Sequence, residues 1–371
     1  MKKLFSLALF FALTFVLFGC EEDESDVYVH VFLETDDEII EEKIPWQAED
    51  FDIITELENV FDLNYQLYDD AVFLNSIGPL DPYEGSFILI EKNGEAIEVG
   101  LNELTFSEDD ELSFSISWWN QTLKDIYDGL VDSQAFVLNH EAYFEAPAEM
   151  YVSLGLAHLE NLSSDTIEMM DASELEEASA LAKEIFVIKA LNEDPSDLQA
   201  HLAATAELIH PYSDAINVLA LQGYEDMTFV DAFIGMADDL VLEETDHDTL
   251  SLVYFALSAY NQDDLAASIA DYLYNHPHEN LWGSNASSYA WLLMVYTHMG
   301  ADLSSEELND GDRSFIETFL AYQTNDGSFI YLSDDEDADL AFSTPQAFLS
   351  LAFAHAFVNG ESTHPFDPYD E

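Results

Sequence analysis

The chain has 371 residues, of which 77 are acidic and only 8 are basic, so its formal net charge is −69. This charge excludes nucleic acids and other polyanions as partners, because neutralising phosphates requires clustered Lys and Arg side chains. Hydrophobic residues make up 49% of the chain, which is enough for a packed core and excludes a disordered acidic tail.

Residues 1–19 are predicted to be a signal peptide and not part of the fold. Two lysines precede an apolar run from Leu4 to Phe18, and the only cysteine, Cys20, follows. This pattern resembles bacterial lipoprotein signals, in which the new N-terminal cysteine receives a lipid. We therefore expect a lipid on Cys20 as the one membrane contact, an acidic tether over residues 20–26, and a chain on the extracellular face. An uncleaved N-terminal anchor is the alternative, although a span needs about 20 apolar residues.

Residues 27–120 are predicted to form a small β-rich domain. Apolar residues alternate with others from Val27 to Leu33, which is typical of a half-buried strand. A short helix is expected within residues 51–60, and further strands at 71–76, 86–91 and 111–118. Asn93-Gly94 predicts a tight hairpin turn after the strand at 86–91.

Four segments of this domain follow one another in a recognisable order: VFLNSIG at 72–78, GSFILIEKNG at 85–94, VG at 99–100 and FSEDDEL at 106–112. Together they resemble the small β-domain at the C-terminal end of transcobalamin and intrinsic factor, which also recurs in bacterial surface lipoproteins. The chain departs from that pattern at Ile88, Leu89 and Ile90, because relatives often carry Trp and Tyr just before the Asn-Gly.

Residues 121–371 are predicted to be helical, and four of the apolar helices align as a repeat. The first aligned position is expected to be a helix N-cap, since a short oxygen-bearing side chain can accept a backbone amide hydrogen there; it holds Asp214, Asp248, Ser287 and Thr344. The position three residues later is small in every copy and holds Asn217, Ser251, Ala290 and Ala347. Small residues followed by apolar ones predict helices that are buried on both sides.

The segment NDGSF at 325–329 precedes the last of these helices, and Leu281-Trp282-Gly283 precedes the one before it. Both are similar to the DGGF motif of α/α-toroids in the prenyltransferase, terpene-cyclase and transcobalamin group. The resemblance implies an α+β protein with a small N-terminal β-rich domain followed by a larger all-α α/α-toroid of helical hairpins. These are the two parts of transcobalamin-like proteins in reversed order.

Aromatic residues are the candidate ligand contacts. Trp118 and Trp119 end the predicted sheet, Trp282 lies in a loop before a predicted inner helix, and Tyr289 lies in that helix. The alternative is that these side chains pack in a core, as aromatic residues at helical spacing usually do.

Two clusters are candidate metal sites. Clustered carboxylates suit calcium, although EF-hand spacing is absent; this cluster is Asp334, Asp335, Asp337 and Asp339. Imidazoles in a toroid mouth could bind zinc if three or four converged; the candidates are His276, His278, His298 and His355. A solvated acidic loop and ordinary core or loop histidines are the respective alternatives.

These features favour a lipid-anchored extracellular protein of a salt-adapted bacterium that binds a small ligand or a surface partner without catalysis. A corrinoid is the first ligand to test, since the resemblance implies cobalamin held between these two kinds of domain. One alternative is a toroid enzyme that processes glycans, which needs two carboxylates at a defined separation. Another is a structural or adhesive surface module. No catalytic triad signature, P-loop or Rossmann glycine pattern occurs.

Overall fold

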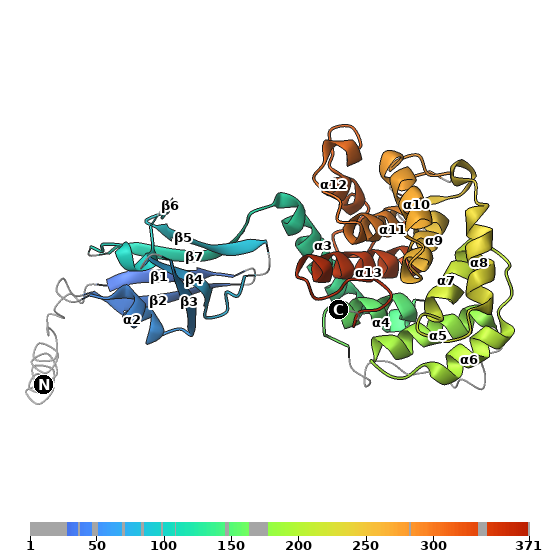
Figure 1. Ribbon diagram of the computed structural model, residues 1–371. Helices are drawn as coiled ribbons and strands as arrows, with labels where there is room; N and C mark the ends of the chain where they lie inside the picture. Colours follow the sequence, from blue (N-terminus) through green and yellow to red (C-terminus); the bar gives the residue numbers. More distant parts are fainter. Residues whose placement is uncertain are drawn as a thin grey trace, which may run out of the picture. The chain divides into compact units, whose positions relative to one another are not determined.

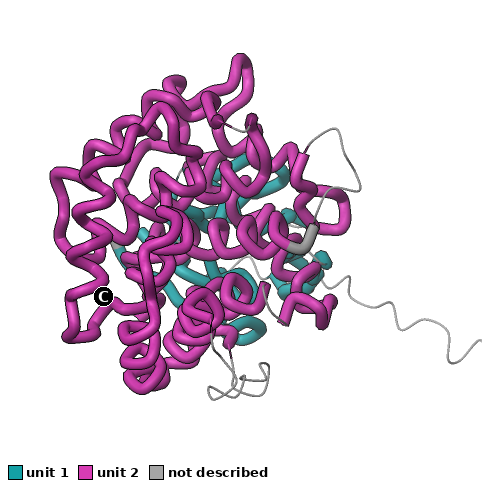
Figure 2. Tube along the Cα trace, turned by 90° about the vertical axis from the view of Figure 1, so that its right-hand side faces the viewer, with its two compact units in different colours: residues 1–119 teal, residues 120–371 magenta. Residues whose placement is uncertain are grey.

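The chain was analysed in a computed structural model that describes residues 28–35, 38–46, 51–68, 71–82, 85–97, 99–107, 109–144, 148–162, 177–281, 283–332 and 340–369. It divides into two compact units, residues 1–119 and 120–371 (Figure 2). The signal segment, Cys20 and the acidic tether lie outside the described residues. Within the described ranges, no helix is both long and apolar enough to span a membrane.

The first unit is built from short strands (Figure 1). A five-stranded sheet has the order β2-β1-β7-β5-β6, and β3 and β4 form a separate two-stranded sheet. Strand β1 pairs with β7 in parallel, while the other pairs are antiparallel. The elements are β1 (Tyr28–Glu34), β2 (Ile39–Pro45), α2 (Ile53–Glu58), β3 (Leu63–Tyr68), β4 (Ala71–Ile77), β5 (Ser86–Lys92), β6 (Glu95–Ala96), η1 (Leu101–Glu103) and β7 (Glu111–Trp118).

Local sequence signals in the first unit are confirmed. In β1, Val29, Val31 and Leu33 are fully buried and the side chains between them are only partly covered. Asn93 and Gly94 have φ values of 54° and 76°, and Lys92 pairs with Glu95 across the turn. A two-residue hairpin loop with a type I′ turn requires positive φ at both central residues.

The second unit is helical, so the chain is an α+β protein, as predicted (Figure 1). Its α-helices are α3 (Gln121–Leu138), α4 (Glu149–His158), α5 (Ala178–Ala190), α6 (Ser196–Thr205), α7 (Pro211–Ala220), α8 (Thr228–Asp238), α9 (His247–Ala259), α10 (Asp263–Asn275), α11 (Ala286–His298), α12 (Phe315–Leu320) and α13 (Leu340–Val358). Short 3-10 turns lie at η2 (Glu141–Phe144), η4 (Leu242–Glu244) and η5 (Glu306–Leu308).

Six of the described helices pack on one another in a closed order: α4 on α5, α5 on α7, α7 on α9, α9 on α11, α11 on α13, and α13 on α4. The other described α-helices of the second unit each pack on members of this set: α6 on α5, α8 on α7, α10 on α9, α12 on α11 and α3 on α13. In the closed set, α4 and α11 are buried almost around their whole circumference. This explains why their sequences carry so few charges.

The repeat alignment predicts burial correctly but places the helix N-caps wrongly. Asn217, Ser251, Ala290 and Ala347 are all buried, as expected. The proposed caps lie inside the helices: Asp214, Asp248, Ser287 and Thr344. The actual N-caps of α7, α9 and α11 are His210, Asp246 and Asn285, whose side chains accept the free backbone amides. The helices begin earlier because these other polar residues satisfy that requirement first.

The NDGSF segment forms a tight turn that ties α13 to the segment before it. The Asp326 carboxylate accepts hydrogen bonds from the Ser328 backbone amide at 3.2 Å and from the Ser328 hydroxyl at 2.8 Å. Phe329 is fully buried, and its backbone amide donates to Thr344 Oγ1 at 2.9 Å. Gly327 has a φ of 89° and lies against the backbone of α3. The motif therefore fixes the path of the chain toward Tyr331.

Candidate functional site

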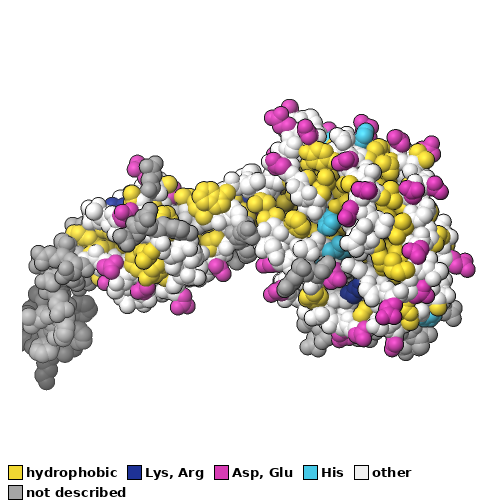
Figure 3. Space-filling view, in the orientation of Figure 1, with side chains coloured by type: hydrophobic (Ala, Val, Ile, Leu, Met, Phe, Trp, Pro, Cys, Tyr) yellow, Lys and Arg dark blue, Asp and Glu magenta, His cyan; other side chains and the backbone are white. Residues whose placement is uncertain are grey.

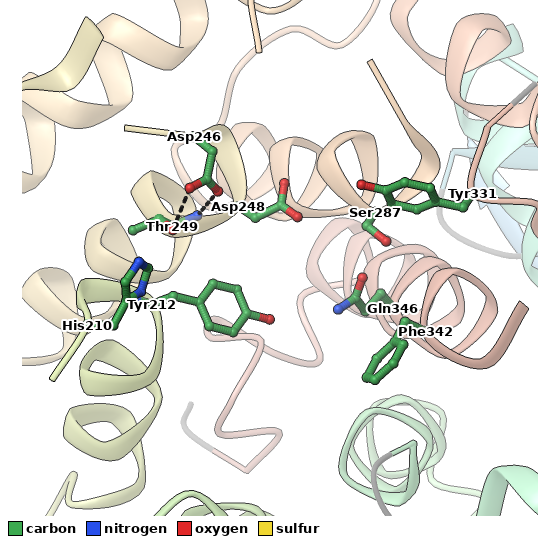
Figure 4. A pocket seen from close by; sticks show the side chains of 9 residues that line it. All are labelled: His210, Tyr212, Asp246, Asp248, Thr249, Ser287, Tyr331, Phe342 and Gln346. Carbon is green, nitrogen blue, oxygen red and sulfur yellow. Dashed lines mark hydrogen bonds between the residues drawn. The ribbon is translucent and has the colours of Figure 1, made fainter. Parts of the chain in front are cut away.

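A cavity of about 450 Å³ opens at the N-terminal ends of α7, α9 and α11, beside the first turns of α13 (Figure 4). We call it the N-terminal pocket. Its described lining consists of His210, Tyr212, Asp246, Asp248, Thr249, Ser287, Tyr331, Phe342 and Gln346. Two carboxylates and three Tyr or Phe rings are among these side chains, whereas none of them is a lysine or an arginine.

Asp246 is held rigidly at the start of α9. As the N-cap, its carboxylate accepts a hydrogen bond from the Thr249 backbone amide at 2.9 Å through one oxygen. The other oxygen accepts the Thr249 hydroxyl at 2.9 Å. Because the cap fixes both oxygens, this residue contributes a negative charge to the pocket at a defined position.

Asp248 lies in the first turn of the same helix and is anchored from α11. The Ser288 hydroxyl donates to Asp248 Oδ1 at 2.6 Å, and Asn280 Nδ2 in turn donates to Ser288 Oγ at 2.7 Å. Burial raises the pKa of Asp248 to about 6; the Ser288 hydrogen bond opposes this rise and the neighbouring Asp246 charge adds to it. A carboxyl group with such a pKa exchanges its proton near neutral pH.

Gln346 presents an unsatisfied acceptor on the opposite wall. Its side chain is only 5% exposed, and its Oε1 atom is buried without a hydrogen-bond partner among the described residues. Hydrogen bonds link Tyr151, behind the wall, to the side chains of Tyr212 and Gln346. Figure 4 shows the Gln346 amide oxygen on the side that faces Ser287 and Asp248.

The aromatic residues predicted to bind ligand lie in different places. Trp119 is 75% exposed and stacks on Phe87, with 4.0 Å between the ring centroids. Trp118 is partly buried at the end of β7. Tyr289 is 2% exposed, and a hydrogen bond of 2.9 Å joins its hydroxyl to His278 Nδ1. Trp282 lies outside the described residues, so ligand contact by these four aromatic residues stays a prediction.

Of the two predicted metal sites, one lies outside the described residues and the other lies within them. Asp334, Asp335, Asp337 and Asp339 lie outside the described residues, so calcium binding there stays a prediction. Across the ranges that the structure does describe, no three His, Cys, Asp or Glu side chains are placed to hold a metal ion. His276, His278, His298 and His355, the candidate zinc ligands, are all described and do not form such a group. Two of them have other hydrogen-bond partners: His278 bonds with Tyr289 and Leu308, and His298 bonds with Tyr254.

The sequence does not identify the pocket residues as site residues. The repeat alignment predicts that Asp248 and Ser287 are helix caps, and Gln346 carries no distinguishing signal. Comparison of the chain with protein-family models, curated proteins and solved structures finds no match.

Proposed function

We propose that this protein is a non-enzymatic binder of a small ligand and that the ligand occupies the N-terminal pocket. The observation that carries the proposal is the pocket itself, a cavity of about 450 Å³ with polar groups from several helices converging beside aromatic rings. Its volume is within the range of pockets that enclose small molecules, roughly 300–1,000 Å³. Ligand recognition would then belong to the second unit.

The proposal includes the architecture and the location of the protein. The second unit is proposed to be an α/α-toroid, with the helices of the closed order as its inner ring and the pocket at the mouth formed by their N-terminal ends. This is supported by the closed packing order and by the NDGSF turn before α13. The chain is proposed to be anchored by a lipid on Cys20 at the extracellular face of the membrane of a salt-adapted bacterium.

A corrinoid is the first ligand to test, on the basis of the transcobalamin resemblance. A complete corrinoid is larger than the cavity, so the pocket would hold only part of it. If a corrinoid is the ligand, titration with cobalamin, including its base-off form, should shift the visible spectrum, and the absorbance should be retained after gel filtration in molar salt. A thermal-shift screen of small molecules should run in parallel on wild type and on Ser287→Phe, which fills the pocket.

Each arm of this experiment decides a different point. If the cobalamin absorbance is lost on the column, a corrinoid is excluded as the ligand, but binding of another small molecule in the pocket is not. Small-molecule hits that stabilise wild type and are lost in Ser287→Phe would support binding at the pocket. If no compound stabilises wild type, or if hits persist in a folded Ser287→Phe variant, the proposed function is wrong.

A toroid enzyme that processes glycans is the second candidate, and the chemistry of Asp248 favours it specifically. Its pKa of about 6 suits a general acid that protonates a leaving group, with Asp246 as the second carboxylate of a pair. This hypothesis predicts that wild type releases sugar from at least one member of a polysaccharide panel and that Asp248→Asn does not. Intact polysaccharides after prolonged incubation with wild type would contradict it.

A further inference from the structure

The N-terminal pocket is rich in hydrogen-bond acceptors and poor in positive charge. Asp246 and Asp248 contribute carboxylates, and Gln346 contributes a buried carbonyl oxygen without a partner among the described residues. A buried acceptor that lacks a donor destabilises the protein. A ligand that brings an N–H or O–H group to this side of the cavity would give the oxygen its missing donor.

The negative charge of the pocket and of the whole chain favours a cationic ligand. No lysine or arginine lies among the described residues of the lining, and on the face shown in Figure 3 acidic side chains are spread over the second unit. The chain carries a net charge of −69, so its field attracts cations and repels anions. Attraction between a cation and the two aspartates is strengthened inside a cavity, where less water screens it.

The aromatic lining fits the same ligand. Tyr212, Tyr331 and Phe342 border the cavity, and Figure 4 shows Tyr212 and Tyr331 extending toward it from opposite sides. Aromatic faces attract cations through their quadrupole and also cover the apolar part of an organic amine. The lining therefore combines ion pairing, hydrogen-bond acceptance and apolar contact.

We propose that the ligand of the N-terminal pocket is an organic amine whose primary or secondary ammonium group binds between Asp248 and Gln346. This inference rests on the proposed function and adds the chemical class of the ligand. The ammonium group donates one N–H to the Asp248 carboxylate and another to Gln346 Oε1. A quaternary ammonium ion lacks an N–H for Gln346, and a neutral polyol lacks the charge for Asp248.

Proton competition gives the interaction a pH dependence. Because burial raises the pKa of Asp248 to about 6, the carboxylate is protonated at lower pH and the amine loses its counter-charge. Affinity is therefore expected to fall as the pH is lowered through 6. The other titratable groups around Asp248 are its neighbour Asp246, His210 at the N-cap of α7, Tyr212 on α7, Tyr151 on α4, and Tyr331. Helices α11 and α13 contribute the uncharged Ser287, Ser288 and Gln346.

The test is calorimetric titration of the full chain at pH 8 in 1 M NaCl, which screens general attraction to the acidic surface. The probes are benzylamine, benzyl alcohol, benzoate and benzyltrimethylammonium, which share a ring and differ in charge and in N–H groups. Benzylamine should bind at least about tenfold more tightly than each of the others. Asp248→Asn and Gln346→Leu should each lower the affinity for benzylamine by about fivefold or more, and should change the affinity for benzyl alcohol by less than about twofold.

The matched control is Asp239→Asn, which removes an equal charge from the exposed C-terminal end of α8. It should leave all four affinities unchanged. Equal loss of benzylamine binding in Asp239→Asn and Asp248→Asn would overturn the proposal, because bulk charge would then explain binding. Equal affinity for amine and alcohol, tighter binding of the quaternary probe, or no amine binding would overturn it as well. The proposed function would still stand if other compounds bind wild type and are lost in Ser287→Phe.

Discussion

Replacing Gly327 with alanine should lower the free energy of unfolding of the second unit by about 4 kcal/mol or more. Gly327 has a φ of 89°, and an added Cβ would lie 2.1 Å from the backbone carbonyl oxygen of Asp132 in α3. Both partners in this clash are backbone, so no side-chain rotation can relieve it. Urea unfolding followed by circular dichroism in 1 M NaCl measures the loss.

Gly223→Ala is the matched control, because Gly223 has a φ of 87° but no atom within 4 Å of its added Cβ. Its free energy of unfolding should fall by only about 1–2 kcal/mol, because alanine is strained in the left-handed region of backbone conformation. Equal losses in the two variants would show that the turn does not press against α3. A larger loss for Gly327→Ala would also be accompanied by weaker ligand binding, since the same segment carries Tyr331 to the pocket.

The parts of the fold that follow from local periodicity could be predicted from the sequence. Alternation in β1 and the small-then-apolar positions around Ser251 and Ala290 report burial directly, and burial is what the structure confirms. Helix starts could not be fixed in the same way. Several short polar residues compete at each start, and the cap of α9 is Asp246 and not Asp248.

The candidate site could not be predicted, because its residues are brought together only by helix packing. Tyr212, Asp248 and Gln346 come from three helices that are far apart in sequence, and no spacing in the chain connects them. The signal in the sequence is a polar residue at an aligned position of an apolar repeat. Asp248 carries that signal, but helix capping explains it equally well, and only the structure shows that Asp246 is the cap.

Acid should destabilise the second unit in 1 M NaCl, with the free energy of unfolding falling as the pH is lowered from 6 to 4. Three buried histidines cause this, since burial lowers the pKa of His158 and His247 to about 4 and that of His364 to about 3. In the unfolded chain each takes up a proton near pH 6.5. Stability present above that pH is therefore lost on acidification, by roughly 1.4 kcal/mol per pH unit for each histidine.

Buried carboxyl groups oppose this loss but do not outweigh it. Burial raises the pKa of Glu149 to about 7 and that of Asp248 to about 6, so each adds stability as the pH falls toward its unfolded value near 4. Burial also raises the pKa of Asp214, whereas it lowers the pKa values of two further histidines, His298 and His355. High salt is needed because, at low ionic strength, protonating the acidic surface relieves repulsion and has the opposite sign.

His364→Asn isolates one of the three histidines. Asparagine keeps a side-chain acceptor for the Phe366 backbone amide, which His364 Nδ1 accepts at 3.2 Å, but it cannot take up a proton. The variant should be less stable at pH 7, because aromatic contacts with Phe255 and Phe366 are lost. Its pH slope between 6 and 4.5 should nevertheless be shallower than that of wild type, by roughly 1.4 kcal/mol per pH unit. His201→Asn on the exposed face of α6 should retain the wild-type slope. An unchanged slope in His364→Asn would show that this histidine is not kept neutral by the fold.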